Sequence, residues 1–174
     1  KSIQSNMFLQ TNNLKNINIP ENSLISSIGF DVLSDSQIEN LYIPSKVEEL
    51  KKGWCSGLEK LANVTISPLN KYFMNCKENN KLILGKSNKN INNFDVIVFA
   101  CRDIKNPIIP KNIKKIQSFS FQLCLQLETV IFEKDSQLQS IKPRAFGFSK
   151  LKGISVPEKV HIIKPSIFEE AINF

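Results

Sequence analysis

Hydrophobic residues along this chain recur in one short pattern that is repeated several times. The clearest copy spans residues 109–132, where the aliphatic pair Ile113 and Ile116 is followed by Phe121, Leu127 and an alternating end. Alternation of apolar and polar residues predicts a β-strand with one buried face. One copy is too short to bury its own apolar face, so we expect the copies to stack into a solenoid.

The spacing of the copies is regular. The aliphatic residue that precedes the aromatic by five lies at positions 3, 28, 50, 116, 141 and 163, which are 25, 22, 66, 25 and 22 residues apart. A period of about 20 to 29 residues is the range of leucine-rich repeats. A longer and a shorter spacing alternate on both sides of the large interval, which argues against chance. We therefore predict about six to seven copies.

Each copy predicts one short strand and one return segment. The strand pattern, as in residues 38–44, ends in proline, which has no N–H and stops a ladder. The return segment is too short for a long helix, so a turn or two of α- or 3₁₀-helix is expected. Pro143 and Pro165 lie where such a short helix would begin, a position that suits proline. The predicted fold is an α/β leucine-rich-repeat solenoid with short strands on the concave face and short helical turns on the convex face.

The repeat is interrupted between residues 67 and 103. Two β-type runs, 81–85 and 94–100, are joined by a link rich in Asn and Lys. This arrangement predicts a β-hairpin packed on the flank of the array. We expect a single solenoid over residues 1–174 with the hairpin module inserted at 67–103. Both ends of the chain fall within copies, so the array is expected to extend further.

Composition changes this picture little. The chain has 174 residues, of which 41% are hydrophobic and 22% charged, as in an ordinary globular chain. The longest apolar run, 96–101, is too short to span a membrane, so no membrane insertion by this segment is expected. The cysteines form no CxxC pair and indicate no zinc site. Free thiols are expected for Cys55 and Cys124, whereas a Cys76–Cys101 bond stays open for a secreted product.

The sequence offers no catalytic or metal-binding set. His161 is the only histidine, which excludes a His-based triad or a multi-His metal site. The carboxylate pairs 48–49 and 169–170 belong to different copies and do not converge on a cleft. No GxGxxG, P-loop or GxSxG pattern occurs. We predict a non-enzymatic protein that needs no cofactor.

Strand positions that point away from the core are the candidate partner-binding residues. Stacking places them in columns on the concave face, which solenoids use for binding. The alternative is that an Asn-rich face only keeps the protein soluble. The sequon Asn63-Val64-Thr65 lies on this face, and we expect it to be unmodified because a glycan there would obstruct binding. The candidates are Asn16, Asn18, Asn40, Tyr42, Asn63, Thr65, Asn106, Ile108, Thr129, Ile131 and Ser155.

The formal net charge of +7, from 23 Lys and Arg against 16 Asp and Glu, would suit an anionic partner. The simpler interpretation is that scattered lysines solubilise the surface. If basic residues on successive links align, they form a stripe that could bind acidic glycans. Nucleic acid is not expected, because aromatic and basic residues do not interleave on one sheet face. The stripe would comprise Lys51, Lys52, Lys111, Lys114, Lys115, Lys142, Arg144, Lys152 and Lys159.

The pattern I-x-x-x-x-F-x-x-C-x-x-L-x-x-I-x-I-P resembles the BspA-type leucine-rich repeats, which occur in surface-antigen families of anaerobic parasitic protists and some oral bacteria. Cys124, three residues before Leu127, sits where that family's cysteine sits, and the insert looks like its recurrent hairpin module. The chain departs from the pattern at Trp54-Cys55, in place of a small residue and Phe, and at Leu58, in place of the cysteine. The resemblance implies a cell-surface or extracellular adhesion-type module that binds a protein on a host or its own surface. A structural stalk or coat segment is the alternative.

Overall fold

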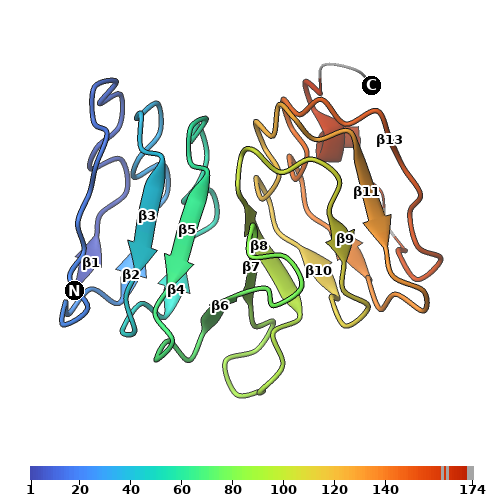
Figure 1. Cartoon of the computed structure of the whole chain (residues 1–174), viewed down its shortest axis with the longest axis horizontal. Coiled ribbons are helices and arrows are strands. Elements are labelled where there is room, and N and C mark those ends of the chain that lie inside the picture. Colours follow the sequence, from blue (N-terminus) through green and yellow to red (C-terminus); the bar gives the residue numbers. More distant parts are fainter. Residues whose placement is uncertain (162, 164, 172–174) are drawn as a thin grey trace.

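The computed structural model describes residues 1–161, 163 and 165–171, which wind into a β-solenoid of about seven turns (Figure 1). Its strands are β1 (Ser2–Ile3), β2 (Ser27–Ile28), β3 (Asn40–Ile43), β4 (Glu49–Leu50), β5 (Asn63–Ile66), β6 (Phe73–Asn75), β7 (Leu82–Gly85), β8 (Val96–Ala100), β9 (Ile108–Ile109), β10 (Lys115–Ile116), β11 (Thr129–Phe132), β12 (Ser140–Ile141) and β13 (Gly153–Ile154), and the 3₁₀-helix η1 spans Pro165–Phe168.

Each coil contributes to two sets of parallel strands, and each set is interrupted once. The first ladder consists of β1–β2–β4 and then β8–β10–β12, and the second ladder consists of β3–β5 and then β9–β11–β13. In the first ladder Ile28 lies between Ile3 and Leu50, which are its partners in register. The sequence spacing of the repeat thus becomes a column of stacked side chains.

The helical turns predicted for the convex side are wrong in general, because η1 is the only helix in the part of the chain that the structure describes. It begins at Pro165, as predicted, whereas Pro143 starts a series of turns and no helix. The return segments are instead successive turns, in which some N–H groups bond within the turn and others bond to the next coil. For example, the N–H of Phe8 donates to the carbonyl of Val32 at 3.0 Å. An α-helix needs those N–H groups within its own turns, so stacking of coils replaces the helix. Residues with positive φ recur four apart in these turns, in the pairs Asn6 and Gln10, Asp31 and Asp35, Gly53 and Gly57, Phe119 and Leu123, and Arg144 and Phe148.

The inserted segment forms part of the solenoid itself. Strand β7 pairs antiparallel with β6 and β8, and β8 also pairs in parallel with β10, so that Ile97 stands beside Ile116. Strand β8 therefore acts as a coil of the first ladder rather than lying on the flank. The sequence does not indicate that β8 is a coil, because the continuous apolar run 96–101 lacks the spaced pattern of the other coils.

The interior consists of two apolar clusters that meet at β7 and β8, which lie in the middle of the molecule (Figure 1). Ile83 and Phe99 belong to the N-terminal cluster, whereas Leu82 and Ile97 belong to the C-terminal one. Trp54, which departs from the repeat pattern, is buried with its ring centroid 5.4 Å from that of Phe99. The two strands thus form a shared wall, and each face closes one half of the solenoid.

Arg102 is buried at the boundary between the two halves, with 4% of its surface exposed. Its Nη2 and Nε donate to the carbonyls of Cys55 and Leu58 at 2.9 and 2.8 Å. Its Nη1 donates to the carbonyl of Ser120 at 3.1 Å. The guanidinium also lies over the ring of Phe99. Arg102 therefore binds main-chain groups on both sides of the boundary, and these hydrogen bonds offset the cost of burying its charge.

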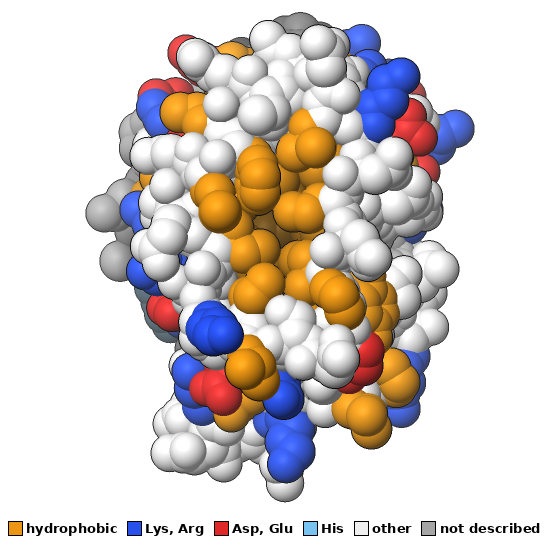
Figure 2. All heavy atoms as spheres, turned by 90° about the vertical axis from the view of Figure 1, so that its left-hand side faces the viewer, with side chains coloured by type: hydrophobic (Ala, Val, Ile, Leu, Met, Phe, Trp, Pro, Cys, Tyr) orange, Lys and Arg blue, Asp and Glu red, His pale blue; other side chains and the backbone are white. Residues whose placement is uncertain are grey.

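The column of strand residues that the repeat pattern assigns to the core is buried in its middle. Leu41, Val64 and Val130 are 3 to 4% exposed, and Ile17 and Ile154 are half-buried. Ile17 lies in the first coil, which has a described neighbour on one side only. Figure 2 views that end of the solenoid, where apolar side chains gather in the middle of the face.

Candidate interaction surface

The eleven candidate residues all lie on the solvent side of the second ladder or of the segments that continue it. Burial alternates along its strands, as in the exposed–buried–exposed–buried sequence of β5. Of the candidates, Tyr42 is half-buried and the others are exposed. We call this solvent side the outer face. The periodicity of two thus places the residues as expected, while their role in binding stays a prediction.

Polar side chains of the N-terminal half are fixed to one another across the strands. Asn40 lies opposite Asn63, and Tyr42 lies opposite Thr65. The Nδ2 of Asn63 donates to Oδ1 of Asn40 at 3.1 Å. Cross-strand pairs of this kind stabilise a sheet and restrict the side-chain rotamers.

The phenol of Tyr42 is held by a carboxylate. Its hydroxyl donates to Oε2 of Glu21 at 2.6 Å, and Oγ of Ser67 donates to Oε1 of Glu21 at 3.1 Å. Hydrogen bonds from Ser45 first, and then from Tyr42 and Ser67, hold the pKa of the Glu21 carboxyl below its usual value. Donation to Glu21 raises the pKa of Tyr42. The ring is therefore presented in one orientation.

An apolar pair lies on the C-terminal half of the outer face. Ile108 of β9 and Ile131 of β11 are partners in register, and they are 54% and 50% exposed. Beside them, Oγ1 and the N–H of Thr129 both donate to Oδ1 of Asn106, at 3.0 and 3.2 Å. Two β-branched side chains thus stand together among polar groups that are already paired.

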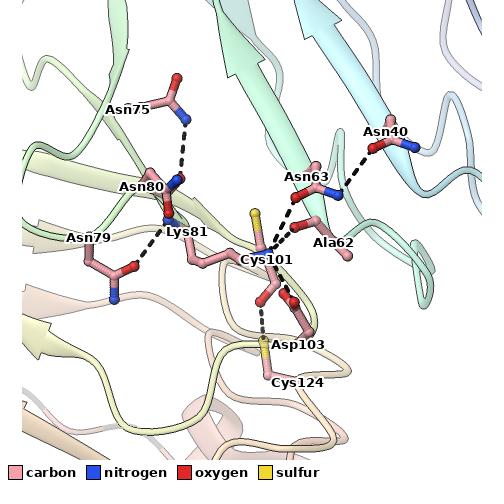
Figure 3. A network of polar contacts seen from close by, with 10 residues as sticks. All are labelled: Asn40, Ala62, Asn63, Asn75, Asn79, Asn80, Lys81, Cys101, Asp103 and Cys124. Atoms are coloured by element: carbon pink, nitrogen blue, oxygen red, sulfur yellow. Dashed lines mark hydrogen bonds and ion pairs between the residues drawn. The ribbon is translucent and has the colours of Figure 1, made fainter.

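Between β5 and the inserted segment lies a pocket of about 250 Å³, which we call the junction pocket. Figure 3 shows the polar contacts around it. Asn63 and Thr65 contribute to it from β5, and Asn75, Asn80 and Lys81 contribute from the inserted segment. The sequence did not predict the residues of the inserted segment as a site. Nothing in an Asn- and Lys-rich stretch separates a pocket residue from one that only solubilises the surface.

The charge of Lys81 is used within the protein. Its Nζ donates to the carbonyl of Ala62 at 2.9 Å, to Oδ1 of Asn63 at 3.3 Å, and to Oδ2 of Asp103 at 2.9 Å (Figure 3). An ammonium has three protons, so these contacts account for all of them. The polar lining of the junction pocket therefore consists of an ammonium whose protons are already used and of amide and hydroxyl groups.

Asn75 closes the edge of β5. Its Nδ2 donates to the carbonyl of Val64 at 2.7 Å, and its Oδ1 accepts the N–H of Ile66 at 3.0 Å. The side-chain amide takes the place that a peptide group of a neighbouring strand would have. Strand β5 therefore ends its ladder here.

The basic residues predicted to form a stripe are in part paired with acids. Each pair joins residues that are 19 to 25 positions apart, and so links neighbouring coils. Such pairs lower the positive charge that an acidic glycan would meet. The pairs are Lys114–Asp95 at 3.8 Å, Arg144–Glu169 at 2.7 Å and Lys152–Glu128 at 3.3 Å.

The thiols are free and buried. No bond joins Cys76 to Cys101, which the sequence left open. Burial raises the pKa of all four thiols, and that of Cys124 reaches about 11. The thiols are therefore protonated at neutral pH and are poor nucleophiles.

Two further features concern the described residues alone. No group of three or more His, Cys, Asp and Glu side chains among them is arranged to hold a metal ion. Within the same residues, no helix has the length and apolar character needed to cross a membrane.

Solved structures share this fold. A leucine rich cell surface protein from Faecalibacterium prausnitzii A2-165 superposes with a TM-score of 0.77 at 18% identity, over 98% of this chain and 48% of that chain. The pneumococcal vaccine antigen PcpA gives a TM-score of 0.74 at 18% identity, over 90% of this chain and 37% of that chain. The chain thus spans less than half the length of either protein.

Sequence comparison agrees with the fold. No curated protein has a sequence that matches this chain. The family model described as BspA type Leucine rich repeat region (6 copies) matches residues 1–72 and 69–174. These two ranges together cover all 174 residues, and the chain therefore belongs to the family of BspA-type leucine-rich repeat regions.

Proposed function

We propose that this chain is a non-enzymatic protein-interaction module of a cell-surface protein, and that it binds its partner through the outer face. Membership of the BspA-type family supports this proposal. So does the fold, which is shared with a protein described as a leucine rich cell surface protein and with a vaccine antigen. Repeat solenoids offer extended surfaces of this kind for binding.

The observation that carries the proposal is the exposed pair of Ile108 and Ile131. Interfaces combine an apolar centre with a polar rim, and a few central residues dominate the binding energy. The two isoleucines provide the centre, and the bonded pair of Thr129 and Asn106 provides part of the rim.

The rest of the outer face is pre-organised for contact. Tyr42 is held by Glu21, and Asn40 is held by Asn63. Side chains that are already ordered lose little conformational entropy when a partner binds. Tyr is also common at the centres of interfaces, because one large ring combines apolar area with a polar hydroxyl.

The test is binding of the purified domain to intact host-type cells, measured by flow cytometry. Ile131→Glu should lower the affinity at least about tenfold, because a charge would be buried against the partner. Leu24→Glu is the matched control, since Leu24 is an aliphatic residue of similar exposure, 54%, outside the outer face. Equal binding by the wild type and Ile131→Glu would overturn the outer-face site.

Salt separates this proposal from the acidic-glycan alternative. Binding through an apolar centre should persist at high ionic strength, whereas attraction between exposed charges is screened. Binding that disappears with added salt would favour the alternative in which the stripe of basic residues binds acidic glycans. Absence of binding at every ionic strength would favour a structural role instead.

A further inference from the structure

The junction pocket has the size of a small ligand and is separate from the Ile108–Ile131 pair. Its volume of about 250 Å³ is far above the roughly 10–15 Å³ that a single water molecule needs. A single ring with several substituents fits such a space, whereas a whole protein surface cannot enter it. Residues of β5 and of the inserted segment surround it from both sides.

The electrostatics of the junction pocket favour an uncharged ligand. Lys81 is paired with Asp103, and its remaining donors go to the carbonyl of Ala62 and to Asn63. An anionic ligand would therefore have to displace contacts that the protein already makes. A cation would meet no carboxylate among the residues that line the pocket, and it would be repelled by the ammonium of Lys81.

The main chain of β5 is closed to an added peptide strand. Binding by strand addition uses free main-chain N–H and carbonyl groups at a sheet edge. On this edge the carbonyl of Ala62 accepts from Lys81, and the groups of Val64 and Ile66 are bonded to Asn75. An extended peptide would find no row of main-chain partners here.

Side-chain groups remain available. In the described structure the hydroxyl of Thr65 and the side-chain amide of Asn80 have no hydrogen-bond partner, and both residues are exposed at the rim. Asn63 uses only one of its two Nδ2 protons, on Asn40. Hydroxyl and amide groups each donate and accept, so this set matches a ligand whose own groups are hydroxyls.

We infer that the junction pocket binds one uncharged sugar residue. The side-chain amide of Asn75 keeps its hydrogen bonds to the carbonyl of Val64 and the N–H of Ile66. The ligand therefore contacts Thr65, Asn80 and the free Nδ2 proton of Asn63. Because Asn63 and Asn75 are held by the protein, the pocket is formed before the sugar arrives. This site lies on the outer face too, but apart from the Ile108–Ile131 pair that forms the proposed protein-binding centre.

The test is titration of the ¹⁵N-labelled chain with methyl α-mannoside, methyl β-galactoside and N-acetylglucosamine, followed by NMR. At least one neutral sugar should produce saturable shifts in the side-chain amide signals of Asn63 and Asn80. Thr65→Val should weaken this binding about tenfold, as expected for one lost hydrogen bond, while keeping a β-branched side chain on the strand. Thr129→Val is the matched control, because Thr129 lies on the same face but away from the pocket.

Two outcomes would overturn the inference: an absence of saturable shifts with all three sugars, or equal affinities for the wild type and Thr65→Val. Tighter binding of galactose 6-sulfate than of the neutral galactoside would also contradict the uncharged class. Ile131→Glu should leave the sugar affinity unchanged. Thr65→Val thus tests sugar binding by the junction pocket, and Ile131→Glu tests binding of a protein partner, so the two proposals can fail separately.

Discussion

The guanidinium of Arg102 lies over the ring of Phe99, with Cζ 4.5 Å from the ring centroid. Phe99 belongs to the N-terminal apolar cluster, although it lies on the strand that joins the first ladder of the C-terminal half. Arg102 also bonds to Cys55 in the one half and to Ser120 in the other. This pair therefore joins the two halves where both ladders are interrupted.

Removal of the Arg102 guanidinium should strongly destabilise the fold. Arg102→Leu removes three hydrogen bonds from a charged group, each worth about 1.5–3 kcal/mol. The carbonyl of Leu58 is left without a donor, whereas those of Ser120 and Cys55 keep the N–H groups of Ala100 and Leu58. We expect a loss of at least about 3 kcal/mol in the free energy of unfolding, measured by urea titration with circular dichroism. Lys152→Leu, which removes only an exposed ion pair, should change this free energy by less than about 1 kcal/mol. Equal stability of the two variants would contradict the role assigned to Arg102.

Gly57 and Gly153 should differ in how far they tolerate substitution by alanine. Gly57 has a φ of 69°, and an added Cβ would collide with Oγ of Ser34. Gly57→Ala should lower the melting temperature, because a left-handed backbone alone costs an L-residue about 1–2 kcal/mol. In β13 a Cβ at Gly153 meets nothing within 4 Å, so Gly153→Ala should be neutral or raise the melting temperature slightly. A stable Gly57→Ala variant would show that the turn can relax.

Opening the edge of β5 should promote self-association. Asn75→Ala leaves the carbonyl of Val64 and the N–H of Ile66 without the side-chain amide that closes them. Free strand edges pair with other chains, so we expect dimers or larger species in analytical ultracentrifugation. Asn92→Ala, in the exposed link between β7 and β8, should sediment like the wild type. The prediction is wrong if Asn75→Ala sediments like Asn92→Ala.

Lowering the pH should reduce the stability that the Glu21–Tyr42 hydrogen bond gives to the fold. The pKa of Glu21 is lower in the folded protein than its ordinary value of 4.5, mainly because Ser45 and Tyr42 donate hydrogen bonds to the carboxylate. The stability from this group is therefore present above about pH 4.5 and is lost as the pH falls through the lowered folded-state pKa. Stability curves between pH 3 and 6 should be flatter for Glu21→Gln than for the wild type. Parallel curves would mean that other carboxyls dominate the acid response.

The sequence alone determined the elements that depend on local periodicity. The spacing of Ile3, Ile28 and Leu50 predicted the stacked coils, because equivalent residues of identical repeats bury one another. A period of two placed Tyr42 and Ile131 on the solvent side, since successive side chains of a strand point to opposite faces. These features need only short-range patterns that repeat.

Only the tertiary structure decided the features that depend on pairing between distant segments. It made Ile97 a neighbour of Ile116 within the ladder, and it directed the N–H of Phe8 to Val32 instead of into a helical turn. It also brought Lys81 and Asn75 against β5, which formed the junction pocket. The physical reason is that a buried N–H or carbonyl must find a partner, and the sequence pattern does not state which coil supplies it.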